Sequence, residues 1–208
     1  MFDFIADLDA FFCEKYANYD KLCVLPGYKQ PMMQATRINE NGTVYAYTLP
    51  MNTMRLALQE NKEELLKELK TRLVDNTFSF SFIPYGFFQK IRLRFAQDSF
   101  HKTLLAFLGK NNLTVDAVGE ELNVSNEVWM KICNGKFAPT KNMIFSIALA
   151  AHLSFEDTDA LMATIGFEWD DSIAKDVVMR YLLQQRVYNR EMIDCALKEY
   201  RVENLFLK

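Results

Sequence analysis

The second half of the chain repeats apolar residues at three- and four-residue intervals, the spacing of one face of an α-helix. Short polar connections separate these stretches, so the pattern predicts a series of helices packed against their neighbours. The expected helices cover residues 100–111, 115–122, 125–134, 140–153, 154–166, 174–185 and 190–200.

The first half of the chain mixes helical and strand-like patterns. Residues 2–19 and 51–73 carry apolar residues at helical spacing, and each stretch is expected to form one helix. Between them, residues 31–38 and 43–49 are rich in β-forming residues and are joined through an Asn-Gly pair. That arrangement predicts a β-hairpin.

Phe78, Phe80 and Phe82 alternate with small polar residues, which predicts a short strand. Pro84 and Gly86 follow and mark a candidate hinge. We therefore expect two domains: an N-terminal α+β part over residues 1–88, and a helical domain with a C-terminal helix extension over residues 89–208. The predicted fold class is an α-dominant α+β protein.

Composition and charge narrow the classes of function. Half of the residues are hydrophobic, which is enough for a packed core. The formal net charge is −3, whereas nucleic-acid binders usually carry a basic face. The four cysteines form no CxxC pair, so reduced thiols in a cytoplasmic protein are expected, with no metal and no cofactor. The acidic start MFDFIADLDAFF is not that of a signal peptide, and no apolar run is long enough to span a membrane.

Residues 113–143 are spaced like a helix-turn-helix. Thr114 and Ser125 stand where helix N-caps are needed, and Asn123 stands in the turn, where a positive φ is expected. Trp129 and Ile132 are three residues apart, so both are predicted to point into the core.

This spacing resembles that of the lambda-repressor/Cro (XRE-type) helix-turn-helix family over about residues 98–166. The matching residues are mainly those that form the fold: Leu113, Leu122, Val124, Ser125, Trp129, Ile132, Gly135, Lys136, Pro139, Ile147, Ala148 and Leu153. The resemblance implies that DNA contacts would come from the start of the second helix and from the exposed face of the third.

Those positions give a mixed indication for DNA binding. Where the family often has a phosphate-binding Gln, this chain has Val115 followed by Asp116. The third helix offers Asn126 and Lys131, but also Glu127. The candidate nucleic-acid-binding residues are Asn126, Lys131, Asn134, Lys136, Lys141, Lys90, Arg92 and Arg94.

The C-terminal stretch resembles the tail of a module found in uncharacterised Firmicutes proteins, in which a degenerate XRE-like unit is followed by a helix pair. The shared features are residues 139–142, Leu153 with Glu156 and Leu161, the Gly166-Phe167 pair, and residues 176–197. This resemblance implies an accessory or regulatory role and names no ligand. The N-terminal part has no recognised relative.

No motif of a known enzyme class occurs in the chain. It lacks a nucleophile elbow, a phosphate-binding loop and a zinc-protease motif, and His101 and His152 stand alone. Asp3, Asp7 and Glu14 recur near helical spacing but have no partner His or Arg, so they are expected to form a solvated helix face. We therefore expect no catalytic residues.

The sequence leaves three functions open. The preferred interpretation is a non-enzymatic regulatory or adaptor protein of a bacterium or its mobile elements, which binds a protein partner through the degenerate helix-turn-helix. The second is a sequence-specific DNA-binding repressor that works as a homodimer. The third is a protein inhibitor of a defence nuclease.

Overall fold

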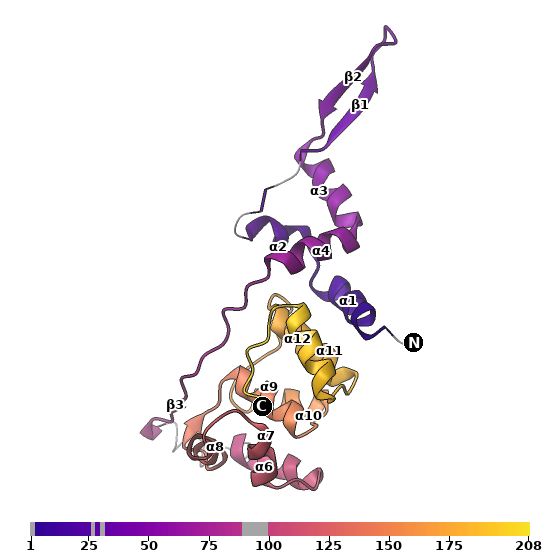
Figure 1. Cartoon of the computed structure of the whole chain (residues 1–208). Helices are drawn as coiled ribbons and strands as arrows, with labels where there is room; N and C mark the ends of the chain where they lie inside the picture. The colour runs from indigo at the N-terminus through magenta and orange to yellow at the C-terminus, as the bar shows by residue number, and fades with distance from the viewer. Residues whose placement is uncertain (1–2, 26–27, 30–31, 89–99) are drawn as a thin grey trace. The chain divides into compact units, whose positions relative to one another are not determined.

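The computed structural model describes residues 3–25, 28–29, 32–88 and 100–208. The chain divides into two compact units, Met1–Val74 and Asp75–Lys208. Both are dominated by helices, and a two-stranded antiparallel hairpin supplies most of the β-structure in the described residues (Figure 1). The predicted α-dominant α+β fold class is confirmed.

The first unit is a small helical cluster that carries the hairpin. Its elements are α1 (Phe4–Lys15), α2 (Tyr19–Val24), β1 (Gln34–Ile38), β2 (Val44–Thr48), α3 (Met51–Glu60) and α4 (Lys62–Arg72). Helix α4 packs against α1 and α2, and the core between them includes Leu8, Phe12 and Leu69. A salt bridge of 2.6 Å between Lys70 Nζ and Asp9 Oδ1 lies beside this core.

The predicted single helix over residues 51–73 is wrong, because the chain breaks at Asn61. Asn61 has φ −89° and ψ 72°, outside the helical region. Its side chain accepts a hydrogen bond from the Glu64 backbone N–H and donates one to the Glu64 carboxylate. Asn61 therefore ends α3 and caps α4, since its local side-chain bonds compete with helix continuation.

The predicted hairpin is confirmed, with Ile38 opposite Val44 and Gln34 opposite Thr48. The turn is closed by Asn39, whose side chain accepts hydrogen bonds from the backbone N–H groups of Asn41 and Thr43. Gly42 has φ +75°, a value that favours glycine, and it supplies the left-handed residue of the turn.

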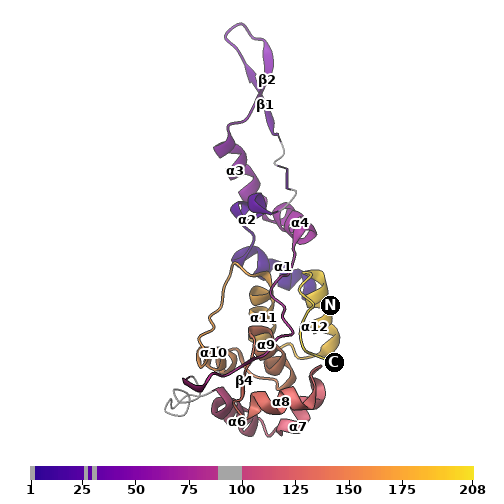
Figure 2. The ribbon, with the colours of Figure 1, turned by 90° about the vertical axis from the view of Figure 1, so that its left-hand side faces the viewer.

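The second unit is a helical bundle around α9. Its elements are β3 (Ile83–Pro84), α6 (Phe100–Lys110), α7 (Val115–Glu121), α8 (Asn126–Cys133), β4 (Phe137–Ala138), α9 (Lys141–Ala150), α10 (Phe155–Ala163), α11 (Ala174–Gln184) and α12 (Arg190–Glu199). Eight of the ten residues of α9 are buried. In Figures 1 and 2, α9 lies between the α6–α8 group and the α11–α12 pair, which makes it the central helix.

The predicted strand at Phe78–Phe82 is wrong: this segment has no regular secondary structure and belongs to the second unit. The rings of Phe78 and Phe82 lie 4.8 and 5.4 Å from that of Phe206, near the C-terminus. Only the next two residues form a strand, in which Ile83 pairs with Ala138. The segment 75–84, here called the strap, is thus held by the core of the helical unit.

The strap explains why the two units divide at 74/75 and not at the expected 88/89. The predicted hinge at residues 84–86 is part of the β3–β4 pairing, and the Tyr85 backbone N–H donates to the Lys136 carbonyl at 3.1 Å. The expected boundary therefore cuts between the strap and the helices that it packs on. No helix in the described ranges is long and apolar enough to cross a membrane.

Candidate functional site

The α7–α8 pair has the local geometry that the sequence predicts. The Thr114 hydroxyl accepts from the Ala117 N–H, and the Ser125 hydroxyl accepts from the Val128 N–H, so both side chains cap their helices. Trp129 is 1% exposed, and its indole N–H donates to the Val115 carbonyl at 2.9 Å. Both predicted caps and the predicted burial of Trp129 are confirmed.

Gly119 on α7 allows the Trp129 indole to lie against that helix. A Cβ atom added at residue 119 would stand 2.7 Å from Trp129 Cδ1. This contact is shorter than any carbon pair tolerates without displacement. The close crossing of α7 and α8 therefore depends on a residue without a side chain at this position.

The turn between α7 and α8 pairs with the C-terminal tail, residues 203–208. Leu122 is extended and forms a β-bridge with Leu207, and the Asn123 N–H donates to the Phe206 carbonyl at 2.9 Å. The expected positive φ at Asn123 is wrong, because Asn123 is not among the positive-φ residues of the described chain. A backbone bridge to a distant segment, which the local sequence does not encode, sets the turn instead.

The outer face of α8 carries the residues that the family resemblance assigns to DNA contact. Asn126, Glu127, Met130 and Asn134 are exposed along it. Lys131, on the same helix, forms an ion pair with Glu127 one turn earlier, and its ammonium group lies 5.1 Å from the centre of the Phe137 ring. The hydrogen bond from Lys131 and its positive charge lower the pKa of Glu127. Lys131 is thus already partnered within the unit.

Lys141 is half-buried, with its ammonium group at the junction of α9 with α11. Its ammonium group forms an ion pair with Asp176, which is 2% exposed, and donates to the Glu168 carbonyl at 2.7 Å. Asp176 also accepts from the Asp170 N–H at 2.8 Å. Burial raises the pKa of Asp176, although Lys141 acts in the opposite direction. These contacts give Lys141 a structural position within the unit.

The remaining predicted site residues divide into two groups. Lys136 is exposed just after α8, close to the exposed Asn134. The basic stretch containing Lys90, Arg92 and Arg94 lies outside the described residues. The structure therefore brings together Asn126, Lys131, Asn134 and Lys136 on or beside α8.

The α7–α8 pair also carries exposed acidic residues. Four exposed carboxylates lie on α7 and α8, against the paired Lys131 and the exposed Lys136; they are Asp116, Glu120, Glu121 and Glu127. Phosphate binding requires a surplus of cations, because neutralising phosphates supplies most of the affinity for duplex DNA. On the described α7–α8 surface, the carboxylates outnumber the lysines.

A buried ion pair in the second unit was not found by sequence reasoning. Lys175 Nζ lies 2.6 Å from Asp75 Oδ2, and the two side chains are 1% and 3% exposed. Lys175 also donates to the Asn204 carbonyl at 3.0 Å, so it joins α11, the strap and the tail. Its only sequence signal is a lysine on the apolar face of a predicted helix, next to Asp176.

The described titratable groups near α8 include the Cys133 thiol and the His101 ring, and burial changes the pKa of each. Burial, together with the charge of Asp116, raises the pKa of Cys133 to about 12, so this thiol is not a nucleophile at neutral pH. Burial lowers the pKa of His101, and its ring lies close to Gly135. Within the described part of the chain, no group of three His, Cys, Asp or Glu residues is placed to hold a metal ion.

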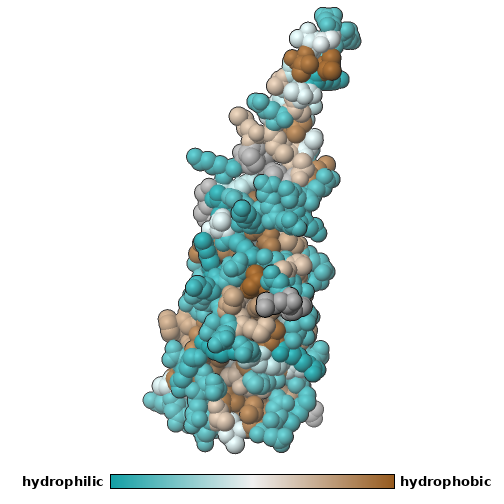
Figure 3. All heavy atoms as spheres, turned by 45° about the vertical axis from the view of Figure 1, so that its right-hand side comes forward, coloured by the Kyte–Doolittle hydropathy of each residue, from teal (hydrophilic) through white to brown (hydrophobic). Residues whose placement is uncertain are grey.

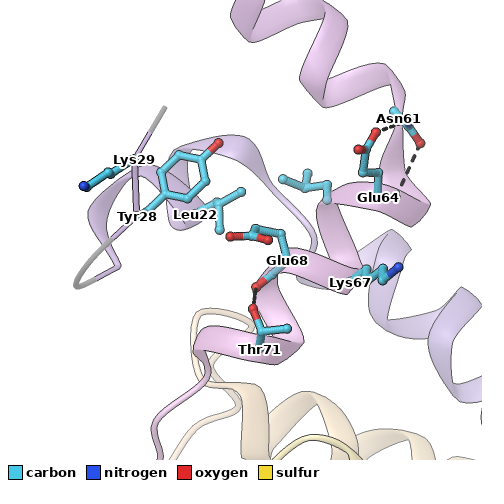
Figure 4. A pocket seen from close by; sticks show the side chains of 9 residues that line it. Leu22, Tyr28, Lys29, Asn61, Glu64, Lys67, Glu68 and Thr71 are labelled. Carbon is cyan, nitrogen blue, oxygen red and sulfur yellow. Dashed lines mark hydrogen bonds between the residues drawn. The ribbon is translucent and has the colours of Figure 1, made fainter. Parts of the chain in front are cut away.

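The first unit contains a half-open cavity of about 440 Å³ beside α4 (Figure 4). Tyr28, Glu64, Lys67 and Glu68 are among the residues that line it. The Glu64 carboxylate accepts from Asn61, and the Glu68 carboxylate accepts from Arg72. Both acids are therefore already partnered within the unit.

Comparison with protein-family models, with curated proteins and with solved structures gave no match. The resemblance to the lambda-repressor/Cro type therefore rests on the residues of this chain alone.

Proposed function

We propose that this protein is a non-enzymatic regulatory or adaptor protein of the bacterial cytoplasm, and that it binds a protein partner through the outer face of α8. The observation that carries the proposal is the ion pair between Lys131 and Glu127. The lysine best placed to reach a base or a phosphate is paired with Glu127 on its own helix.

The charge around α8 supports the same proposal. If Lys131 left Glu127 to bind DNA, the exposed Glu127 carboxylate would face the phosphate backbone. The two negative charges would repel each other. Asp116 stands near the start of α7, where an anchor to phosphate would be needed. An acidic, partly apolar surface is better suited to a protein than to duplex DNA.

Met130 gives this face an apolar centre. It is 36% exposed and lies between the polar residues Asn126 and Asn134 on α8. Methionine is enriched in protein interfaces because its flexible thioether adapts to different partner surfaces. An exposed methionine with a polar rim is the arrangement expected of a small protein-binding surface.

The DNA-binding repressor remains the second candidate, because Asn126 and Asn134 are exposed at the two ends of α8. An asparagine side chain can form two hydrogen bonds with adenine in the major groove. This candidate requires phosphate contacts from outside the α7–α8 surface.

A selection from random duplex oligonucleotides separates the two candidates. We expect no enriched sequence, and an affinity no tighter than ~10⁻⁵ M for random duplex at physiological salt, as in non-specific binding. The variant Lys131→Ala tests the groove-facing position, and Lys198→Ala on α12 removes the same charge elsewhere. One enriched palindrome, bound at nanomolar strength and lost only in Lys131→Ala, would establish the repressor instead.

A further inference from the structure

The β1–β2 hairpin of the first unit leaves its apolar side chains in solvent. Ile38 is 66% exposed and Val44, opposite it, is 62% exposed; Tyr45 and Tyr47 are exposed on the other face. Figure 3 shows hydrophobic side chains gathered near the end of the hairpin. An isolated two-stranded hairpin is marginally stable in water, and a third strand or a packed face is usually required.

The two edges of this hairpin differ in protection. Exposed strand edges are normally blocked by charged residues, prolines or bulges, which prevent pairing with another chain. Strand β1 contains Arg37, whereas β2 has the sequence VYAYT and contains no charge and no proline. The β2 edge therefore lacks the usual protection against strand addition.

The hydrogen bonds of the hairpin show which residues of β2 face its outer edge, with which no strand of the described residues pairs. Asn39 N–H donates to the Thr43 carbonyl, and Leu49 N–H donates to the Met33 carbonyl. In an antiparallel pair, alternate residues direct their N–H and C=O toward the partner strand. Residues 43, 45, 47 and 49 thus bond toward β1, and Val44, Ala46 and Thr48 direct theirs outward.

We propose that this outward edge pairs with β2 of a second copy of the chain, antiparallel and about a two-fold axis at Ala46. In this register Ala46 faces its own copy and Val44 faces Thr48, so outward backbone groups meet outward backbone groups. The two hairpins then form one four-stranded sheet, which supplies the third strand that each hairpin lacks.

The side chains fit this register. Tyr45 and Tyr47 lie on one face of the hairpin, with ring centres 6.4 Å apart. The two-fold places Tyr45 of one copy opposite Tyr47 of the other, at a non-hydrogen-bonded pair, where cross-strand side chains are closest. Two aromatic pairs therefore form across the junction.

Charge favours β2 over β1 and a second copy over a charged partner. In a short two-fold strand pair, a charged residue near the axis lies close to the same residue of the other copy, and the two like charges repel. The absence of charge in β2 removes this penalty, whereas equivalent pairing of β1 about Thr36 would make the two Arg37 side chains diagonal neighbours on one face. The interface is small, so we expect a dimer in the micromolar range, as for weak complexes.

Sedimentation velocity of the full chain tests the pairing. Ala46→Pro removes the outward N–H at the two-fold and leaves the bonds to β1, so we expect the dimer to be lost. Thr36→Pro is the matched control, because Thr36 lies opposite Ala46 and directs its backbone groups to the other edge. This variant should retain the dimer, and circular dichroism should show unchanged helix content in both variants.

Disulfide cross-linking tests the register independently of proline. In a chain with Cys13, Cys23 and Cys195 replaced by serine, Ala46→Cys should form a disulfide-linked dimer under mild oxidation. A directly opposed pair has Cα atoms about 5.5 Å apart, within disulfide range. Thr36→Cys in the same background should not. A wild-type chain that stays monomeric at ~100 μM, well above the expected micromolar range, would overturn the proposal. So would equal effects of the two proline variants, or equal cross-linking of the two cysteine variants.

Discussion

Trp129 joins α7 to α8 through two contacts of different kinds. Its indole N–H bonds to the Val115 carbonyl, and its ring lies against Gly119. The sequence predicts the burial of Trp129, because three-residue spacing from Ile132 places both side chains on one helix face. The contact with Gly119 could not be predicted, since it depends on how two helices cross.

We expect Trp129→Ala to lower the free energy of unfolding of the helical unit by about 3–5 kcal/mol, as for other buried aromatic residues replaced by alanine. Urea denaturation followed by circular dichroism measures the loss. Met130→Ala on the same helix is the control, and its effect should stay within about 0.5 kcal/mol, because the residue is exposed. Equal effects of the two changes would mean that the α8 register is wrong.

Gly119→Ala and Gly109→Ala should change stability in opposite directions. The new methyl group at residue 119 meets the Trp129 ring and costs about 1–3 kcal/mol. The new methyl group at residue 109, near the end of α6, meets nothing within 4 Å. It should raise the free energy of unfolding by about 0.5–1 kcal/mol, because alanine favours a helix more than glycine does. Thermal melts of the two variants show the sign of each change in stability. Stabilisation by both variants would refute the close crossing of α7 and α8.

At the scale of elements, the helices of the second unit follow the sequence prediction closely. Their apolar residues recur at helical spacing, and Thr114, Ser125 and other caps fix their starts locally. The strap could not be predicted, since its Phe residues are organised by Phe206, far along the chain. The ion pair of Lys141 could not be predicted for the same reason, because its partner Asp176 lies on another helix.

The ion pair of Asp75 with Lys175 gives a prediction about unfolding. Asp75→Asn leaves a buried lysine without its counter-charge, and removing one partner of such a pair typically costs 3–5 kcal/mol, so we expect a loss of about that size. The double change Asp75→Leu with Lys175→Met removes both charges and should cost less. Urea denaturation of the single and double variants tests this order, and a double variant less stable than Asp75→Asn would contradict it.

The same pair predicts a pH dependence. Burial raises the pKa of Asp75, but the hydrogen bonds from Lys175 and Thr77 outweigh burial and hold it below its ordinary value of 3.8. A lowered carboxyl pKa contributes stability above the ordinary value, and that contribution is lost as the pH falls through the lowered one. The difference in unfolding free energy between wild type and Asp75→Asn should therefore be constant near neutral pH and shrink below pH 3.8. A difference that grows on acidification would contradict this sign.

At the scale of the whole molecule, the division at 74/75 predicts which fragments fold alone. Residues 75–208 keep the strap, with its contacts to Phe206, Lys175 and Ala138, and should melt cooperatively with helical circular dichroism. Residues 89–208 lack the strap, so Lys175 has no counter-charge and part of the Phe206 ring is uncovered. We expect the shorter fragment to be less stable; equal melting temperatures would show that the strap contributes nothing.

The proposed function is tested most directly by a photo-cross-linking amino acid placed at Met130 in the cells that naturally carry the protein. Leu105 on α6 is the matched control, since it is also apolar and exposed. Adducts from both positions are analysed for protein and for nucleic acid. We expect a distinct protein adduct from Met130, absent from Leu105, and no nucleic-acid adduct. Recovery of DNA fragments with one shared sequence, cross-linked from position 130, would contradict the proposed function. So would the same adducts from both positions.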